Sequence, residues 1–515
     1  MANKSLFSSA LARFLPQTDA VNDAGGAAYA YGAEAKLAQL AATGTLSDGF
    51  YSGADAQLAD ILTAAQAAPS DFVAKVAVYA RKSGAMKDMP ALLAAYLTVA
   101  DPDLAVRVFG RVIDNGRMLR NFVQIMRSGQ VGRRSLGSRP KRLVREWLEK
   151  ASMPQLMTAA TGNDPSLADI VRMVHPAPAS AERRAFYGWL IGKPYDVAAL
   201  PVEIAAFEVW KRDPAGSLPP VPFEWLTAFP LTAGQWAELS GRIGWQALRM
   251  NLNTLARNGA FDVKGVTEKV AARLSDADTI ARVRPAPYQL MVAMGQVGDA
   301  VPLAVQAALE EVLELSLRAV PVLAGKVVVC PDVSGSMSWA ATGYRKGATS
   351  AVRCIDIAAL VAAAVLRTNR SARVMPFDVD VVDMALDPKA RVAVNAARLA
   401  AIGGGGTNVS APLARLNRER AKVDTVVIVS DNESWIDPTR RGATATMNEW
   451  NKLRARNPGA KLICIDIQPY GSTQAKDRKD IMNVGGFTDA VFEAMARFAA
   501  GETRDWVEIV NETEV

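Results

Sequence analysis

The chain has 515 residues, half of them hydrophobic and 22% charged, a balance typical of a folded protein with two or three domains. Lys and Arg number 59 against 52 acidic residues, so the net charge of +7 permits a polyanionic partner without requiring one. Three cysteines without a CxxC pair and a single histidine argue against a disulfide framework and against a structural zinc site. No signal peptide and no run of about 20 apolar residues is evident, so we expect a cytoplasmic protein without a membrane partner.

Residues 1–320 are predicted to form an array of short helices. Apolar side chains recur at helical spacing, for example at Val305, Leu309, Val312 and Leu313. Pro and Gly divide these runs into short pieces, and the proline-rich stretch Pro214–Pro222 is predicted to be a loop. Many short helices over about 300 residues indicate a stacked, HEAT-like helical repeat, although the sequence has no clean period.

Residues 321–515 have a different pattern, in which short β-branched runs alternate with helical stretches. The predicted strands are Lys326–Cys330, Arg373–Val379, Thr425–Val429, Leu462–Ile467 and a possible last one at Trp506–Val510. The predicted helices between them include Ala351–Leu366 and Ala411–Arg420. Apolar strands alternating with helices predict a doubly wound α/β domain with a parallel sheet, in which ligands bind beyond the carboxyl ends of the strands.

Three separate segments of this domain carry oxygen ligands suited to one hard cation. Asp332, Ser334 and Ser336 follow the first strand, Thr407 lies in a four-glycine loop, and Asp431 follows the strand Thr425–Val429. Two carboxylates and three hydroxyls suit Mg²⁺ or another divalent cation and leave a position open for water or an acidic group. The order strand–DxSxS, glycine-rich loop with Thr, and strand–Asp resembles the metal-ion-dependent adhesion site of von Willebrand A domains.

The same residues allow one other interpretation, and their spacing excludes three more. Ser334 and Ser336 could form only a turn that caps the next helix, with Asp431 as another cap. The glycine run lacks the Lys-Ser/Thr of a P-loop, and an EF-hand would need Glu where Gly343 stands. A nucleophilic serine would need G-x-S-x-G and a nearby base, and neither is present.

Residues 127–150 contain eight basic residues and only two acidic ones. The basic residues are Arg127, Arg133, Arg134, Arg139, Lys141, Arg142, Arg145 and Lys150. Pro140 suits the first turn of a helix that buries Leu143, Val144, Trp147 and Leu148 and exposes Arg142 and Arg145, with Lys141 near the border. Such a face suits phosphates, and Gly129–Ser138 could follow a nucleic-acid backbone. An ordinary solvated face remains the alternative.

His175 stands at the end of a further predicted helix, before Pro176. Arg172 is three residues earlier and therefore adjacent on the helix surface. A histidine in this position is often only a local hydrogen-bonding group.

A helical array followed by an A-type domain resembles the Ro ribonucleoprotein family, whose helical part is called the TROVE module. The matching segments are Asn22–Gly26, Tyr79–Arg81, Met86–Pro90, Gly132–Leu136 and Asp169–Pro176, together with the five residues of the metal motif. The resemblance covers nearly the whole chain. The weak positive charge is a departure, since a ring that threads RNA would be expected to be more basic.

The resemblance implies a non-catalytic protein that binds RNA and takes part in RNA quality control or decay. In the family the helices close into a ring that accepts single-stranded 3′ ends of misfolded RNA, and Y RNA binds the outer basic surface. His175 and the Arg133–Arg134 region fall in matching segments and are predicted RNA contacts. We add Arg127, Lys141, Arg142, Arg145 and Arg172 from the pattern itself. Partners would be noncoding RNA, including Y-like RNA, and an exoribonuclease, with no DNA.

Two other hypotheses remain open at this point. The A-type domain could grip an acidic side chain of a protein partner through the cation, with the helices as a spacer. Alternatively, Asp332 and Asp431 could serve a metal-dependent nuclease, but the hydroxyl-rich ligand set argues against this, since such chemistry often uses two metals held by more carboxylates.

Overall fold

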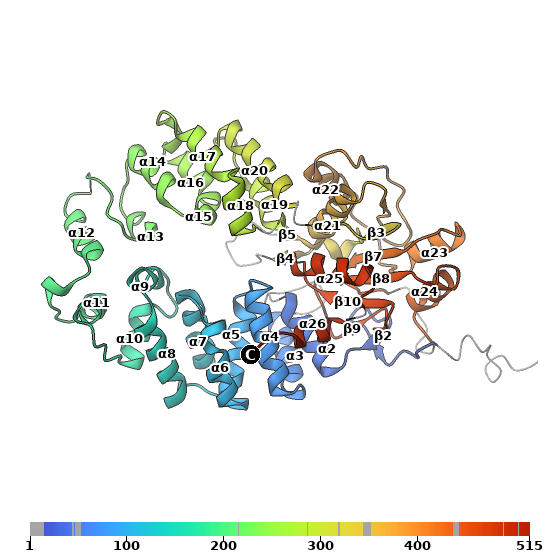
Figure 1. Cartoon of the computed structure of the whole chain (residues 1–515), viewed down its shortest axis with the longest axis horizontal. Coiled ribbons are helices and arrows are strands. Elements are labelled where there is room, and N and C mark those ends of the chain that lie inside the picture. Colours follow the sequence, from blue (N-terminus) through green and yellow to red (C-terminus); the bar gives the residue numbers. More distant parts are fainter. Residues whose placement is uncertain are drawn as a thin grey trace, which may run out of the picture. The chain divides into compact units, whose positions relative to one another are not determined.

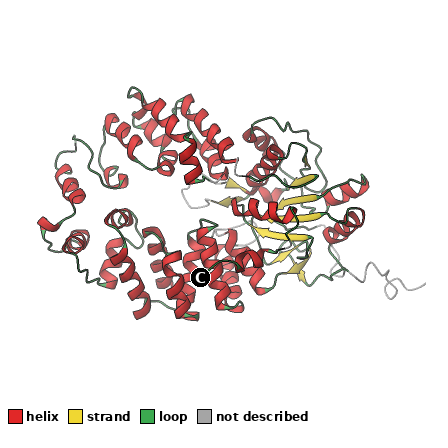
Figure 2. Ribbon diagram, viewed as in Figure 1, coloured by secondary structure: helices red, strands yellow, loops and turns green. Residues whose placement is uncertain are grey.

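The computed structural model describes residues 15–43, 46, 53–214, 216–285, 287–317, 320–342, 352–435, 442–487, 489–502 and 504–515. The chain divides into two compact units. The first, which we call the sheet unit, comprises Met1–Gly84, Arg284–Val292 and Leu313–Glu514. The second, the helical unit, comprises Ala85–Val283 and Ala293–Val312. Figure 1 labels the elements, and Figure 2 shows the strands, all of which belong to the sheet unit within the described residues.

The helical unit is built from short helices, as predicted. They are α5 (Asp88–Ala100), α6 (Pro102–Val112), α7 (Gly116–Ser128), α8 (Ser138–Lys150), α9 (Met153–Ala159), α10 (Leu167–Val174), α11 (Ala181–Ile191), α12 (Val202–Trp210), α13 (Phe223–Leu226), α14 (Ala233–Arg242), α15 (Trp245–Met250), α16 (Leu252–Arg257), α17 (Val266–Leu274) and α18 (Ala277–Val283), with parts of α19 (Pro287–Gln296) and α20 (Leu303–Ser316). Helices close in sequence pack on each other, as α5 does on α6 and α7, which is the arrangement expected of a stacked array.

Local sequence signals explain where several of these helices begin. The Asp101 side chain accepts hydrogen bonds from the backbone N–H groups of Asp103 and Leu104, and Pro102 occupies the first turn. Ser152 and Ser166 each form a capping box at the start of α9 and α10. In the described part of the chain no helix has the length and apolar character needed to cross a membrane.

The sheet unit contains a parallel five-stranded sheet in the order β10-β8-β7-β3-β6. The strands are β3 (Val327–Pro331), β6 (Arg373–Val374), β7 (Thr425–Ser430), β8 (Lys461–Asp466) and β10 (Ile481–Gly485). The helices that follow β3 in the chain are α21 (Cys354–Thr368), α22 (Val392–Ala400), α23 (Ala411–Arg418), α24 (Ala445–Arg456), α25 (Asp489–Ala499) and α26 (Trp506–Asn511). Cys330, Cys354 and Cys464 are free and buried in this unit.

Alternation along the strands gives the sheet two covered faces. Val328, Ile428 and Cys464 pack with Leu413 of α23 and Trp450 of α24 in one buried cluster. The alternate positions of the strands face the other side of the sheet, where the sheet contacts the long, almost fully buried helix α21. This confirms the predicted doubly wound α/β fold.

The described residues of the segment before Ala85 pack with the sheet unit, whereas the sequence pattern placed the division at residue 320. Their elements are β1 (Ala20–Val21), β2 (Ala27–Ala30), α2 (Ala33–Thr43), α3 (Ala54–Ala67) and α4 (Ser70–Lys82). β2 pairs antiparallel with β9 (Ser472–Thr473), α2 contacts β10, and α4 contacts α26. These contacts join residues more than 400 positions apart, and no local pattern signals such pairing.

Two strand predictions in the C-terminal part need correction. Trp506–Val510 is not a strand but helix α26, because Asp505 and Glu508 form a capping box and the buried Trp506 and Val510 are four residues apart. The predicted strand Arg373–Val379 is regular only at β6, since Pro376 cannot donate a ladder hydrogen bond. Strand β10 was not predicted, because the buried Asn483 interrupts its apolar run. Of the predicted helix Ala351–Leu366, Ala351 lies outside the described residues, as does Gly343.

Candidate metal centre and nucleic-acid interface

Asp332 and Asp431 leave neighbouring strands at the same edge of the sheet. In the ladder between β3 and β7, Pro331 is in register with Val429, and the backbone N–H of Asp332 donates to Val429 O at 2.9 Å. Each acid therefore follows the carboxyl end of its strand within two residues. This is the convergence that the strand pattern predicts.

The serines of the DxSxS turn connect these two acids. Ser334 N donates to Asp332 Oδ1 at 2.8 Å, and Ser334 Oγ lies 3.3 Å from Ser336 Oγ. The Ser336 hydroxyl in turn hydrogen-bonds the Asp431 carboxylate. Ser334 precedes the short 3-10 helix η4 (Gly335–Ser338), but its hydroxyl makes no capping hydrogen bond. The simple capping interpretation of Ser334 therefore does not describe its side chain.

The glycine-rich loop docks on the same turn and carries Thr407 to it. Gly335 N donates to Gly405 O at 3.0 Å, and Gly404 N donates to Val333 O at 3.1 Å. Gly404 has φ +128°, a conformation that other residues rarely adopt. Thr407 is buried, and its carbonyl accepts from Ser434 Oγ at 3.4 Å. The three sequence segments therefore meet at one place.

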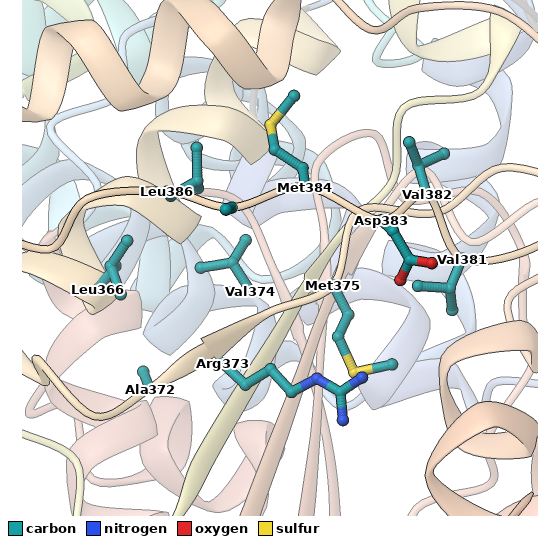
Figure 3. Close-up of a pocket in the computed structure, with 11 residues that line it drawn as sticks. Leu366, Ala372, Arg373, Val374, Met375, Val381, Val382, Asp383, Met384 and Leu386 are labelled. Carbon is teal, nitrogen blue, oxygen red and sulfur yellow. The ribbon is translucent and has the colours of Figure 1, made fainter. Parts of the chain in front are cut away.

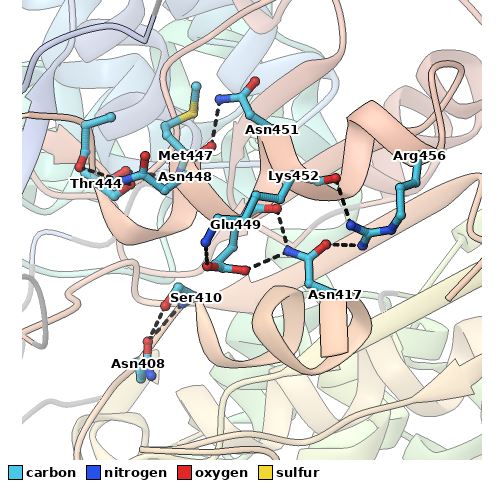
Figure 4. Close-up of polar contacts among 11 residues, drawn as sticks. Asn408, Ser410, Asn417, Thr444, Met447, Asn448, Glu449, Asn451, Lys452 and Arg456 are labelled. Carbon is cyan, nitrogen blue, oxygen red and sulfur yellow. Dashed lines mark hydrogen bonds and ion pairs between the residues drawn. The ribbon is translucent and has the colours of Figure 1, made fainter. Parts of the chain in front are cut away.

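The residues after Thr407 fix the loop to the following helix. Figure 4 shows Asn408 beside Ser410, whose hydroxyl and backbone N–H donate to Asn408 Oδ1 at 2.7 and 3.2 Å. Asn408 Nδ2 also donates to Val379 O at 3.1 Å. Further along α23, Asn417 Nδ2 donates to Glu449 Oε2 of α24 at 2.7 Å. These bonds join the end of the glycine-rich loop to Val379 and join α23 to α24.

The site is buried and strongly acidic. Asp332 and Asp431 are 0% and 2% exposed, and no ion pair joins either carboxylate to a base within the described residues. Burial, and then the nearby charge of Asp431, raise the pKa of Asp332 to about 7. Burial also raises the pKa of Asp431. Two buried like charges without a basic partner are unfavourable unless protons or a cation neutralise them.

The donor set fits a hard divalent cation. Every side chain that the sequence analysis proposed as a ligand presents oxygen, and all five are buried. In the described ranges no group of three His, Cys, Asp or Glu residues is arranged as a metal site. The ion would be held by Asp332, Ser334, Ser336, Thr407 and Asp431. Mg²⁺ suits such a site, because it prefers oxygen ligands and keeps some of its bound water.

Helix α8 in the helical unit has the predicted two faces. Leu143, Val144 and Leu148 are buried, and Trp147, predicted on the same face, is only partly buried. Arg142 and Arg145 are exposed, and Lys141 is intermediate. Pro140 lies in the first turn, as expected from its fixed φ. The helix therefore presents cations to solvent while its apolar stripe packs inside the unit.

Three of the predicted RNA contacts already have protein partners. Arg142 pairs with Glu146 at 3.6 Å, and Arg172 pairs with Asp169 at 3.4 Å and donates to Ile191 O. Arg145 Nε donates to Val174 O, the last carbonyl of α10. His175 is exposed next to that bond and adopts φ +48°, which ends α10 where the sequence predicted. The Arg145 side chain and His175 are therefore neighbours.

The end of α7 and the loop between α7 and α8 present cations without such partners. Arg127 in the last turn of α7 and Arg133 and Arg134 in the loop are exposed, and no side-chain ion pair or hydrogen bond joins any of the three to another described residue. The side chains lie against glycines: a Cβ on Gly137 would be 3.1 Å from Arg133 Nη1, and one on Gly129 would be 3.3 Å from Arg134 Cγ. Both glycines have positive φ, at +67° and +91°. The loop thus exposes guanidinium groups on a compact backbone.

Comparison with known proteins assigns the C-terminal region. Residues 326–499 match the family described as the Ro60 vWA domain. These residues form a Ro60-type von Willebrand A domain. The resemblance to the Ro ribonucleoprotein family that the sequence motifs suggested is thereby confirmed.

The similarity to Ro60 extends beyond the A domain. The chain is 26% identical to the RNA-binding protein RO60 of Deinococcus radiodurans over 529 aligned positions, which cover 95% of this chain and 97% of the relative. The crystal structure of the Deinococcus radiodurans RO (RSR) protein matches 92% of this chain and 100% of its own with a TM-score of 0.62 at 21% identity, which shows a shared fold. The curated relative is named as an RNA-binding protein.

Three residues near the site of the Ro60-type A domain were not predicted. Ser430 Oγ donates to Asp332 Oδ2 at 2.6 Å. Asp466 is in register with Ser430 at the end of β8 and is 1% exposed, and burial raises its pKa well above the ordinary value. Burial also raises the pKa of Glu433 to about 9. Asp466 directly follows the apolar run Leu462–Ile465, so its position at a strand end was the available signal.

A cavity of about 250 Å³ lies elsewhere in the A domain, at the β6 edge of the sheet. Figure 3 shows its lining, which includes Leu366, Arg373, Met375 and Met384. None of the proposed cation ligands lines this cavity. The candidate chemistry is therefore at the carboxyl ends of the strands and not in this pocket.

Proposed function

We propose that the protein binds structured or misfolded noncoding RNA and acts in RNA quality control or decay. The observation that carries the proposal is the match to an RNA-binding protein over 95% of this chain and 97% of the relative. The exposed, unpaired arginines Arg133 and Arg134 supply the chemistry, because guanidinium groups bind phosphate oxygens through paired hydrogen bonds. The helical unit would bind single-stranded 3′ ends, and Y-like RNA would bind its outer basic surface.

The proposed contacts differ in strength. Arg127, Arg133 and Arg134 would contact phosphates directly, while Lys141, Arg142, Arg172 and His175 would extend the same charged surface. Arg145 would act mainly by holding the end of α10, since its guanidinium already donates to Val174 O. The A domain would carry Mg²⁺ and contribute no catalysis, and an exoribonuclease would be the partner that degrades the bound RNA in the cytoplasm.

The test is RNA binding by the charge-reversal variant Arg133→Glu with Arg134→Glu. The ligand is a hairpin RNA with a single-stranded 3′ tail, and binding is measured by fluorescence anisotropy across a salt series. Loss of two phosphate contacts should weaken binding at least about tenfold and reduce the slope of log K against log salt by about 1.4. The matched control, Arg418→Glu with Arg420→Glu, makes the same charge change at exposed positions of the A domain and should retain most of the affinity. Equal losses in both variants would contradict the proposal.

One observation favours a second candidate function, capture of a protein partner through the cation. Trp435 is 50% exposed, and its ring packs on Gly406 next to Thr407. Trp residues are enriched at the energetically important positions of protein interfaces, and Trp435 lies beside the proposed cation site. The variant Asp332→Ala discriminates the two functions, because it should abolish partner capture but leave RNA binding unchanged.

A further inference from the structure

The segment Asn22–Gly26, which we call the N-terminal turn, is built around its asparagine. Asn22 Oδ1 accepts from Gly26 N at 2.6 Å, and Asn22 N donates to Gly26 O at 2.9 Å. Gly25 adopts φ +86°, and its N–H donates to Asn22 O at 3.0 Å. Asn22 is 5% exposed. The motif therefore specifies one tight, buried turn.

This turn is bonded to the loop that carries Asp431, residues 431–434, which we call the acidic loop. Asn22 Nδ2 donates to Ser434 O at 2.7 Å across 412 positions of sequence. Ala24 N donates to Glu433 Oε2 at 3.1 Å. A Cβ on Gly26 would lie 2.2 Å from Ser434 O, so only glycine permits this approach. The N-terminal turn and the acidic loop are therefore in direct backbone contact.

The two acidic-loop residues that the turn holds are the ones that touch the proposed cation ligands. Glu433 N donates to Asp431 Oδ1 at 3.4 Å, and Ser434 Oγ donates to Thr407 O at 3.4 Å. On its other side the acidic loop is held by Asn432, which has φ +62° and donates to Thr473 Oγ1 at 3.0 Å. Two hydrogen bonds and one close approach from the N-terminal turn thus fix the outer side of the acidic loop.

We propose that the N-terminal turn positions the acidic loop, so that docking of residues 22–26 sets the cation affinity of the A domain. The proposal rests on the cation site described above. Mg²⁺ requires near-ideal octahedral geometry, so a small displacement of Asp431 or Thr407 lowers its affinity. Because coupling between two sites is reciprocal, a bound cation also stabilises the docked turn.

The first experiment compares two glycine-to-alanine variants of the full chain. Gly26→Ala places a methyl group against Ser434 O, whereas Gly32→Ala places it in open space at an ordinary φ. Mg²⁺ and Mn²⁺ binding is measured by titration calorimetry. We expect Gly26→Ala to bind either cation at least about tenfold more weakly and Gly32→Ala to bind as the wild type does. Equal affinity in wild type and Gly26→Ala would overturn the role of the turn and leave the cation site standing.

The second experiment uses the unaltered protein, so that it does not depend on how a variant folds. Hydrogen exchange at the backbone N–H groups of Ala24 and Gly26 is followed with and without Mg²⁺. Both should exchange several-fold more slowly with Mg²⁺, and Asp332→Ala should remove the difference. If the wild type binds the cation but the exchange rates of these N–H groups are the same with and without Mg²⁺, the proposal is overturned. A wild type that binds neither cation would overturn the cation site itself and the inference with it.

Discussion

The proposed cation site and the exposed arginines Arg133 and Arg134 differ in the contacts that hold their side chains. Asp332, Ser334 and Asp431 are buried, Ser334 N donates to Asp332 Oδ1, and the Ser336 hydroxyl hydrogen-bonds the Asp431 carboxylate. Arg133 and Arg134 are exposed, and their charges face solvent. Few residue types can replace a buried polar side chain, so the sequence alone indicates the chemistry of such a cluster. An exposed charge has few such restrictions, and its function must be measured.

The largest expected effect separates the two regions. Asp332→Ala removes one of two proposed carboxylate ligands, and cation binding measured by calorimetry should become undetectable. The matched control is Asp383→Ala, whose side chain is 78% exposed and which should bind the cation normally. RNA binding should be unaffected by either variant. A large loss of RNA affinity in Asp332→Ala alone would show that the two regions are not independent.

The pH dependence of cation binding is the next largest effect. With the pKa of Asp332 raised to about 7, the cation must displace a proton at lower pH, so its affinity should fall about tenfold per unit below pH 7. The same shift acts on stability without the cation. The folded chain binds more protons than the unfolded chain between pH 3.8 and about 7, so the free energy of unfolding should decrease as pH rises through this window.

Both pH dependences can be measured. Cation titrations at pH 6 and 8 test the change in affinity, and urea denaturation without cation at pH 5 and 7 tests the change in the free energy of unfolding. Glu419, held by Arg373 and Arg415, provides an internal contrast, because these hydrogen bonds lower its pKa to about 2 and it stays ionised throughout. Cation affinity that is constant from pH 5 to 8 would contradict the acidic, buried character of the site.

A smaller effect is expected at Ser430, which supports a ligand without being one. Ser430→Ala removes the hydroxyl that donates to Asp332 Oδ2, and cation affinity should fall about tenfold, as is usual for groups behind a metal ligand. Calorimetry with Mn²⁺ measures the change. Rescue by Ser430→Thr, which keeps a hydroxyl, is the matching control, and a loss as large in that variant would indicate misfolding.

The smallest effect distinguishes two arginines of the same helix. Arg145→Ala removes a hydrogen bond to the end of α10 and should lower the free energy of unfolding by about 1 kcal/mol. Arg142→Ala breaks only an exposed ion pair with Glu146 and should change it by less than about 0.5 kcal/mol. Urea denaturation followed by circular dichroism measures both, and equal effects would contradict the structural role given to Arg145.

The parts of the molecule that the sequence predicted are those with a local pattern. The β-branched runs at β3, β7 and β8 and the spacing of α8 were sufficient to place the sheet, the acids after β3 and β7, and the exposed arginines. The strand predicted at Trp506–Val510 was wrong. The β-branched residues there are typical of strands, but the capping box of Asp505 and Glu508 stabilises the start of a helix.

The parts that could not be predicted depend on contacts between distant segments. Glu433 has a role only because Ala24, more than 400 residues earlier, donates to it. Likewise, β2 pairs with β9 across the length of the chain. Asn22–Gly26 was recognised as a motif, but only the structure assigns it a neighbour. Single-sequence patterns carry no information about such pairings.

RNA affinity measured against salt concentration tests the central claim most directly. The ligand is the hairpin RNA with a free 3′ tail, and the full-length protein is titrated from 50 to about 300 mM salt. If exposed guanidinium groups bind phosphates, log K should fall linearly with log salt, with a slope of about −0.7 for each contacted phosphate. Affinity that does not change over this range, or no binding at the lowest salt, would contradict the proposed function.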